Sequence, residues 1–374
     1  MAKKPKKEAP GNFVSEWFGH RIYPAVVSSP ESIADQKGER CPFLSDATGE
    51  TRKCIKPDAS KGVCTINTLG KGGRQDWLVC PYRALNRAII VGAVRQLFQV
   101  ASSIEPYACP GVTLKKQPVR DDILVRLKAG QHVFIYFDAK MGGELSIPPT
   151  DRSPEFGFDV TIVELALEGG LPRIGRFAIL EIQTMDFHGS YRAAVRNLRD
   201  GLRLHPNTFP ATLKDNPQWL CEGIEGPNIA NVFKRTFYQM MFKFQLGQHD
   251  RCAGCVLAIP QAVWDSWQRH LGAPVLTAEA DGVFSLLAPG QARSPTPPAW
   301  IYVFSPDATA ASTPSPIKVA KIIATDAPAM SHWALDIAPA AAIANIGSSS
   351  GMLSLLARRL NGLWPELAKT VILT

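Results

Sequence analysis

The sequence predicts an α/β fold in which a mixed central sheet is flanked by helices, with a small cysteine-rich region beside it. Between residues 116 and 290, short segments with alternating apolar side chains are separated by longer segments whose apolar residues recur at helical spacing. The first pattern is typical of strands and the second of amphipathic helices. Five of the eight cysteines precede residue 116, in a part of the chain with few long periodic segments.

The central region divides into individual elements. Strands are expected over 132–137, 158–165 and 176–183, and helices over 119–128, 190–204 and 229–246. In the third strand, the even-numbered residues 178–182 face one side, whereas Glu181 and Gln183 face the other with their odd-numbered neighbours. Ser190 is expected to cap the helix that follows this strand.

Composition separates three segments. Residues 1–115 form an N-terminal region that contains the cysteine cluster, and residues 116–290 form the α/β core. Residues 291–374 are rich in Pro and Ala, with an apolar strand at 300–304 and a C-terminal helix near 352–360 that is expected to pack on the core.

Charge and hydropathy restrict the function classes. The chain has 374 residues, 45% of them hydrophobic and 20% charged, which is typical of a folded globular protein rather than a disordered one. No apolar stretch is long enough for a membrane span, and the lysines near the start precede no apolar segment of a signal peptide, so we expect a cytoplasmic protein without a membrane partner. The net charge of +8 favours a polyanionic partner.

Acidic residues occur in two of the expected strands. Glu181 and Gln183 leave the same face of strand 176–183, and Asp159 joins them if the strands pair as a hairpin through the turn at 169–172. Two carboxylates and an amide are suitable ligands for Mg²⁺, which activates water for phosphodiester hydrolysis. The alternative is an exposed, solvated strand face. Glu144 lies fifteen residues before Asp159 and either completes the site or is simply exposed at a glycine turn.

Four cysteines, Cys41, Cys54, Cys64 and Cys80, fall within forty residues. Four thiolates suit a tetrahedral zinc or iron site, which would organise a region without a large core. Because the intervening stretches of 12, 9 and 15 residues contain no CxxC pair, four independent buried thiols are an equal alternative.

Two helices carry basic residues. Arg192, Arg196, Arg199 and Arg203 form one stripe of helix 190–204, which either contacts DNA phosphates or is a solvated face. Helix 229–246 contains polar residues of the types that contact DNA bases and phosphates, including Lys234, Arg235 and Gln239, while its aromatic residues are expected in the core.

These residues lie within text that resembles the NotI restriction endonuclease family. The resemblance covers about residues 12–270, and its matching segments are NFVSEWFGHRIYP (12–24), CPFL (41–44), DWLVCP (76–81), GGELSI (142–147), SPEFGFD (153–159), LEIQTMDFHGSY (180–191), GPNIANVFKRTFYQM (226–240) and AIPQAVW (258–264). It implies a PD-(D/E)xK nuclease core in which Asp159, Glu181 and Gln183 form a D…ExQ variant of the motif, with Glu144 as a fourth member. A lysine usually occupies the position of Gln183 in that superfamily.

The resemblance also implies a function. We expect a type II restriction endonuclease that acts as a homodimer on double-stranded DNA, with Mg²⁺ for catalysis and iron, or less favoured zinc, held by Cys41, Cys54, Cys64 and Cys80. The expected target is a GC-rich palindrome, GCGGCCGC or a shorter site containing GGCC. A cognate DNA methyltransferase and a prokaryotic cytoplasm follow from that role. The alternatives are a non-cleaving DNA-binding regulator with a four-cysteine metal site on a nuclease-like core, and a repair or recombination nuclease that recognises DNA structure rather than sequence.

Overall fold

The computed structural model describes residues 11–70, 72–280, 282–307, 313–346 and 349–370. A nine-stranded mixed sheet forms its centre, with the strand order β14-β15-β17-β16-β13-β10-β9-β6-β5. In chain order these strands are β5 (Tyr107–Pro110), β6 (Val133–Phe137), β9 (Val160–Glu168), β10 (Leu171–Ile182), β13 (Cys252–Pro260), β14 (Thr277–Ala280), β15 (Val283–Ser285), β16 (Ala299–Pro306) and β17 (Ile317–Thr325). Strand β10 is antiparallel to β9 and parallel to β13, so the expected mixed α/β sheet is confirmed.

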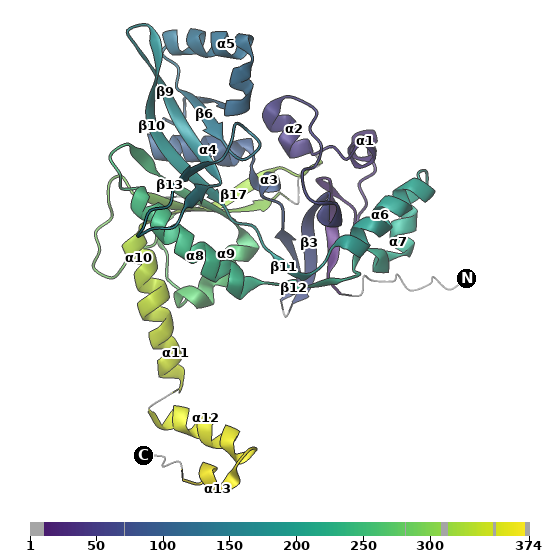
Figure 1. Ribbon diagram of the computed structural model, residues 1–374, viewed down its shortest axis with the longest axis vertical. Helices are drawn as coiled ribbons and strands as arrows, with labels where there is room; N and C mark the ends of the chain where they lie inside the picture. Colours follow the sequence, from purple (N-terminus) through teal and green to yellow (C-terminus); the bar gives the residue numbers. More distant parts are fainter. Residues whose placement is uncertain (1–10, 71, 281, 308–312, 347–348, 371–374) are drawn as a thin grey trace.

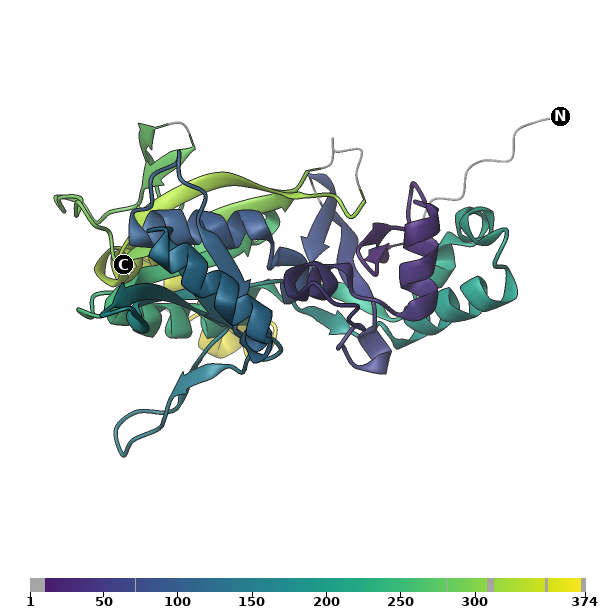
Figure 2. The same ribbon diagram turned by 90° about the horizontal axis from the view of Figure 1, so that it is seen from above.

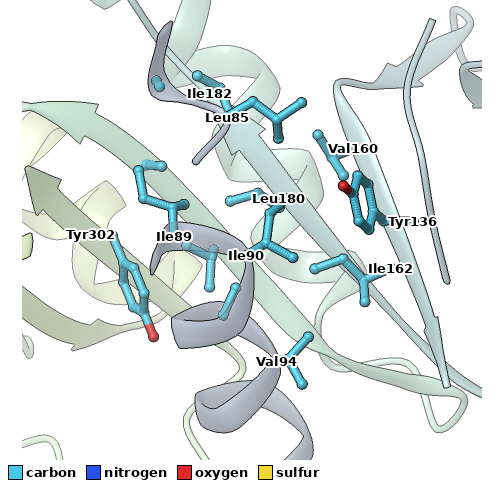
Figure 3. Close-up of a cluster of buried hydrophobic side chains, with 14 of the residues drawn as sticks. Leu85, Ile89, Ile90, Val94, Tyr136, Val160, Ile162, Leu180, Ile182 and Tyr302 are labelled. Atoms are coloured by element: carbon cyan, nitrogen blue, oxygen red, sulfur yellow. The ribbon is translucent and has the colours of Figure 1, made fainter. Parts of the chain in front are cut away.

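Strand β10 contributes to two cores because its alternate side chains enter opposite faces of the sheet. Ala178, Leu180 and Ile182 belong to a cluster with helix α4 (Arg87–Phe98), shown in Figure 3. Ile179 belongs to a second cluster with helices α8 (Ile229–Leu246), α9 (Gln261–Trp267) and α10 (Ala327–Ser331). The alternation expected from the sequence is therefore confirmed.

Helix α5 (Gln117–Lys128) covers the sheet near β6 and β9, through a third cluster that contains Ile123, Leu127 and Val163. Beside it, the β9–β10 hairpin turns at Gly169 and Gly170, whose φ angles of 57° and 78° are the left-handed conformations that such a tight turn requires. The turn expected over 169–172 is thus confirmed at the two glycines, whereas Leu171 and Pro172 already belong to β10. The short strands β7 (Leu145–Ile147) and β8 (Phe156–Phe158) pair in an excursion that projects from the body in Figure 2.

The N-terminal region forms a separate four-stranded antiparallel sheet. Its order is β2-β1-β3-β4, from β1 (Phe13–Trp17), β2 (His20–Arg21), β3 (Val63–Gly70) and β4 (Gly73–Leu78). Around it lie helices α1 (Pro30–Gly38), α2 (Pro42–Thr48) and α3 (Pro81–Ala84). Short 3₁₀ turns occur at Asp58–Ser60, Gly111–Lys115, Pro217–Leu220 and Gln268–Leu271.

After β10 the chain passes through the short strand β11 (Phe187–Gly189) into helix α6 (Arg192–Leu204), which lies away from the central sheet. Its apolar face, with Ala194, Val195 and Leu198, packs with helix α7 (Phe209–Asp215) against the N-terminal sheet. The two-stranded ribbon of β11 (Phe187–Gly189) and β12 (Ile224–Pro227) joins this unit to α8. The expectation that Ser190 is the N-cap residue is wrong, because Tyr191 occupies that position and makes no side-chain capping bond. The Ser190 hydroxyl oxygen instead accepts the Arg192 N–H at 3.2 Å.

The C-terminal segment contributes more to the core than its composition suggested. Strands β16 and β17 lie inside the central sheet: β16 pairs with β13 on one side and with β17 on the other. The central sheet therefore extends beyond residues 116–290, and it also includes β5 from the first segment.

The expectation that the C-terminal helix packs on the core is wrong. A π-helical turn (His332–Ile337) continues α10 into α11 (Ala338–Ile346), which leads α12 (Ser349–Asn361) and α13 (Pro365–Ala368) away from the sheet in Figure 1. On α12, Met352, Leu355 and Leu356 are about half exposed. None of the helices in the described part of the chain combines the length and apolar composition needed to cross a membrane.

Candidate active site

Two hydrogen bonds connect Asp159 to the end of β10, one with the Glu181 side chain and one with the Ile182 backbone. Because Val160 pairs with Leu180, the residue before β9 lies beside the end of β10. The backbone N–H of Asp159 donates to Oε1 of Glu181 at 3.2 Å, and Oδ2 of Asp159 accepts the backbone N–H of Ile182 at 2.9 Å. These bonds fix the direction of both carboxylates relative to the sheet.

The two carboxylates differ in their surroundings. Asp159 is exposed, whereas Glu181 is only 8% exposed. Burial raises the pKa of Glu181 to about 8; the nearby charge of Asp159 adds to the shift and Lys243 opposes it. Since a buried carboxylate is costly without a compensating positive charge, this site favours a nearby cation.

Lys243 of α8 provides one such cation. Its Nζ forms an ion pair with Oε2 of Glu181, and its side chain is almost completely buried. The sequence placed Lys243 in helix 229–246 but did not assign it to the site, since it lies sixty residues after Gln183. The sequence offered one indication that Lys243 is buried: it lies on the same helix face as the apolar residues Met240 and Phe244.

Gln183 also contacts α8. Its Oε1 accepts the hydroxyl of Thr236 at 2.5 Å, and its Nε2 donates to the carbonyl of Thr184 at 2.5 Å. Both ends of the amide are therefore held, which gives Gln183 a fixed orientation beside the carboxylates.

A cavity of about 340 Å³ lies between the end of β10 and α8. Asp159, Glu181 and Gln183 line it together, so the structure brings three of the predicted site residues to one place. Arg235 and Gln239, predicted to contact DNA, are on its wall, and Arg235 Nη2 forms an ion pair with Asp186 at 2.7 Å. The volume accommodates several waters, which a hydrated cation requires.

Glu144 borders a second, smaller cavity of about 100 Å³ that also includes Asp159, Asp138 and Tyr82. Its Oε1 lies 2.8 Å from the position that a Cβ would occupy on Gly157. Glu144 is exposed in the loop before β7, and it lines the same small cavity as Asp159.

The four predicted metal-binding cysteines are reduced and interact with one another. The neighbouring Cys64 thiol holds the pKa of Cys80 below its usual range, and the positive charge of Lys56 acts in the same direction, whereas burial opposes it. Burial raises the pKa of Cys41 to about 12, with smaller effects from Cys80 and Cys54. Within the described residues, however, no three His, Cys, Asp or Glu side chains form a group that could hold a metal.

The predicted basic residues lie on two separate surfaces. Arg192, Arg196 and Arg199 line a depression of about 360 Å³ beside the N-terminal sheet. Arg199 forms ion pairs with Glu39 at 2.7 Å and with Asp58 at 3.5 Å, so it is partly neutralised. Lys234 is exposed on α8, next to Arg235 in the sequence, and does not line the active-site cavity.

The chain matches no known protein-family model and has no significant match among the curated proteins. Its function is therefore inferred from the residues and geometry of this site.

Proposed function

We propose that the protein is a Mg²⁺-dependent type II restriction endonuclease that cuts both strands of DNA within a GC-rich palindrome. The observation that carries the proposal is the pair of carboxylates Asp159 and Glu181, locked together at the end of β10 in one polar cavity with Gln183. The order of strand, acid, hairpin and acid-x-amide supports a PD-(D/E)xK nuclease core.

The donor set fits Mg²⁺. This ion is commonly held by one or two carboxylates together with waters and substrate phosphates, so a group of three acidic residues is not required. Asp159 Oδ1 makes no hydrogen bond to the backbone of β10, and Glu181 lies beside it. Glu144 would approach from the adjoining cavity. When bound, the ion would lower the pKa of a water and offset the negative charge that develops on the phosphate.

The protein side chains provide orientation and charge. Asp159 and Glu181 hold fixed positions through backbone hydrogen bonds, while Gln183 places a neutral amide at the edge of the same cavity. Such preorganisation reduces the cost of bringing water and phosphodiester into line.

DNA binding is supported by the exposed polar side of α8. Arg235 and Gln239 line the active-site cavity, and arginine and glutamine recognise guanine and adenine edges in the major groove. Lys234 and the arginines of α6 would contact phosphates, which positions the duplex without reading its sequence. Because one active site cuts one strand, a two-fold symmetric homodimer matches a palindrome such as GCGGCCGC or a shorter site containing GGCC.

The four-cysteine site is proposed as a structural iron or zinc centre. Its support is placement: Cys41, Cys64 and Cys80 are buried in the N-terminal region, and Pro81, next to Cys80, lines the active-site cavity. Because the described residues contain no ready group of three ligands, metal binding would have to draw the thiols together. A centre at this position would support the wall of the active site. The proposed enzyme would work in a prokaryotic cytoplasm with a cognate methyltransferase that protects host DNA.

The test is incubation of the protein with Mg²⁺ and GC-rich plasmid and linear DNA, with Glu181→Ala as the matched control. We expect discrete fragments from wild type and intact DNA with the variant. Specific binding without cleavage across divalent metals would instead indicate a regulator. Cleavage that depends on DNA structure would indicate a repair nuclease.

A further inference from the structure

The site has an unusual distribution of charge for its proposed chemistry. Position 183 holds a neutral glutamine, and Arg235 on the cavity wall is paired with Asp186. A cation nevertheless reaches the carboxylates from another element, because Lys243 pairs with Glu181. Lys243 is 2% exposed and lies behind Glu181 rather than on the cavity wall.

Two side-chain contacts connect helix α8 to the end of strand β10. Thr236 holds Gln183, and Lys243, two helical turns later, holds Glu181. Seven helical residues rise roughly 10 Å, whereas two strand residues span roughly 7 Å. The long, flexible lysine side chain spans this difference and brings its ammonium group to the carboxylate.

A purely structural role explains this pair poorly. Buried ion pairs add little stability compared with apolar residues of the same size. The adjacent residues Met240 and Phe244 are buried in the apolar cluster, so a methionine at position 243 would suit the packing. The lysine instead contacts one oxygen of Glu181 while the Asp159 N–H contacts the other.

We propose that Lys243 is a positioning residue that takes over, from α8, the electrostatic role of the lysine that position 183 lacks. This inference rests on the proposed nuclease function. Lys243 holds the Glu181 carboxylate in place for metal binding and reduces the repulsion between the two acidic groups. It acts through Glu181 and has no direct contact with the space where DNA would bind.

The test moves the positive charge from position 243 on α8 to position 183 at the end of β10. Lys243→Met should lower the cleavage rate about 10- to 100-fold, the usual effect of losing a residue that orients a metal ligand. Gln183→Lys combined with Lys243→Met should restore most of the rate, because it returns a cation to the same carboxylate from the strand. Lys243→Arg should retain most activity, and Lys128→Met on α5 is the control for loss of a lysine elsewhere.

Thermal unfolding and DNA affinity are measured for every variant. The inference is supported if Lys243→Met folds and binds DNA but cuts slowly while the relocated lysine recovers cutting. Wild-type rates in Lys243→Met would overturn it, as would a loss that neither Lys243→Arg nor the relocated lysine repairs. If Lys243→Met fails to fold, the cleavage rates of Lys243→Arg and of the double variant are used instead. Rates near wild type in these two variants support the inference, and slow cleavage by both folded variants overturns it. A wild-type protein that leaves DNA intact with Mg²⁺ would overturn the proposed function itself.

Discussion

The backbone N–H of Asp159 donates to the carboxylate of Glu181 at 3.2 Å, so the two acidic residues of the candidate site are coupled through the main chain. Asp159 in turn accepts the Ile182 N–H at 2.9 Å. The position of each carboxylate therefore depends on the pairing of β9 with β10.

Glu181→Ala should abolish cleavage while leaving specific DNA binding largely intact. Losing a metal ligand removes several kcal/mol of transition-state stabilisation, which corresponds to about 1000-fold or more in rate. Single-turnover cleavage and a binding assay in Ca²⁺ measure the two properties separately. Normal cutting by this variant would show that the catalytic motif lies elsewhere.

The stability of the metal-free protein should depend on the protonation of Glu181. Burial raises its pKa from 4.5 to about 8, so the folded protein holds a proton that the unfolded chain releases between these values. This contribution is fully present below about pH 4.5 and is lost as the pH rises through about 8. Each pKa unit corresponds to roughly 1.4 kcal/mol, giving a change of a few kcal/mol.

Glu181→Gln provides the comparison, because a neutral amide has no such titration. Urea unfolding of both proteins in EDTA, from pH 5 to pH 9, should show the variant gaining stability relative to wild type as the pH rises. Parallel stability profiles would contradict the raised pKa of Glu181.

Gly157→Ala should slow cleavage with little effect on folding. Its Cβ would lie 2.8 Å from Oε1 of Glu144, and that flexible side chain would move away from Asp159. If Glu144 belongs to the site, Gly157→Ala and Glu144→Gln should each lower the rate, by about 10- to 100-fold. Gly226→Ala, where a Cβ meets no atom within 4 Å, is the control. Unchanged rates in both Gly157→Ala and Glu144→Gln would remove Glu144 from the site.

Cys54→Ala should lose a structural metal and lower the unfolding temperature. Elemental analysis of the purified protein should find about one iron or zinc ion per chain, as four thiolates bind either metal. Cys221→Ala, outside the cluster, should keep the metal. A metal-free protein whose stability is unaffected by Cys54→Ala would leave four independent thiols as the explanation.

The parts of the fold that depend on local periodicity were predictable from the sequence. The alternation of β10, the glycine turn at Gly169 and the bounds of α8 all follow from neighbouring residues, and the structure confirms them. The same local pattern placed Glu181 and Gln183 on one face, where they now line one cavity with Asp159.

Contacts between elements that are far apart in the chain could not be predicted from the sequence. Periodicity does not tell which strand lies next to β10, so the insertion of β13 and β16 into the sheet centre was not expected. For the same reason the sequence did not predict that the apolar face of α6 packs on the N-terminal sheet. Lys243 was missed because its contact with Glu181 depends on how α8 crosses the sheet.

The most direct test of the central claim is to digest a sequenced genomic DNA with the purified protein and Mg²⁺ and to map every new end. The proposed enzyme predicts ends on both strands at one recurring GC-rich palindrome, and no such ends with Glu181→Ala. Intact DNA, or ends shared equally by wild type and Glu181→Ala, would contradict the assignment of cleavage to Asp159, Glu181 and Gln183.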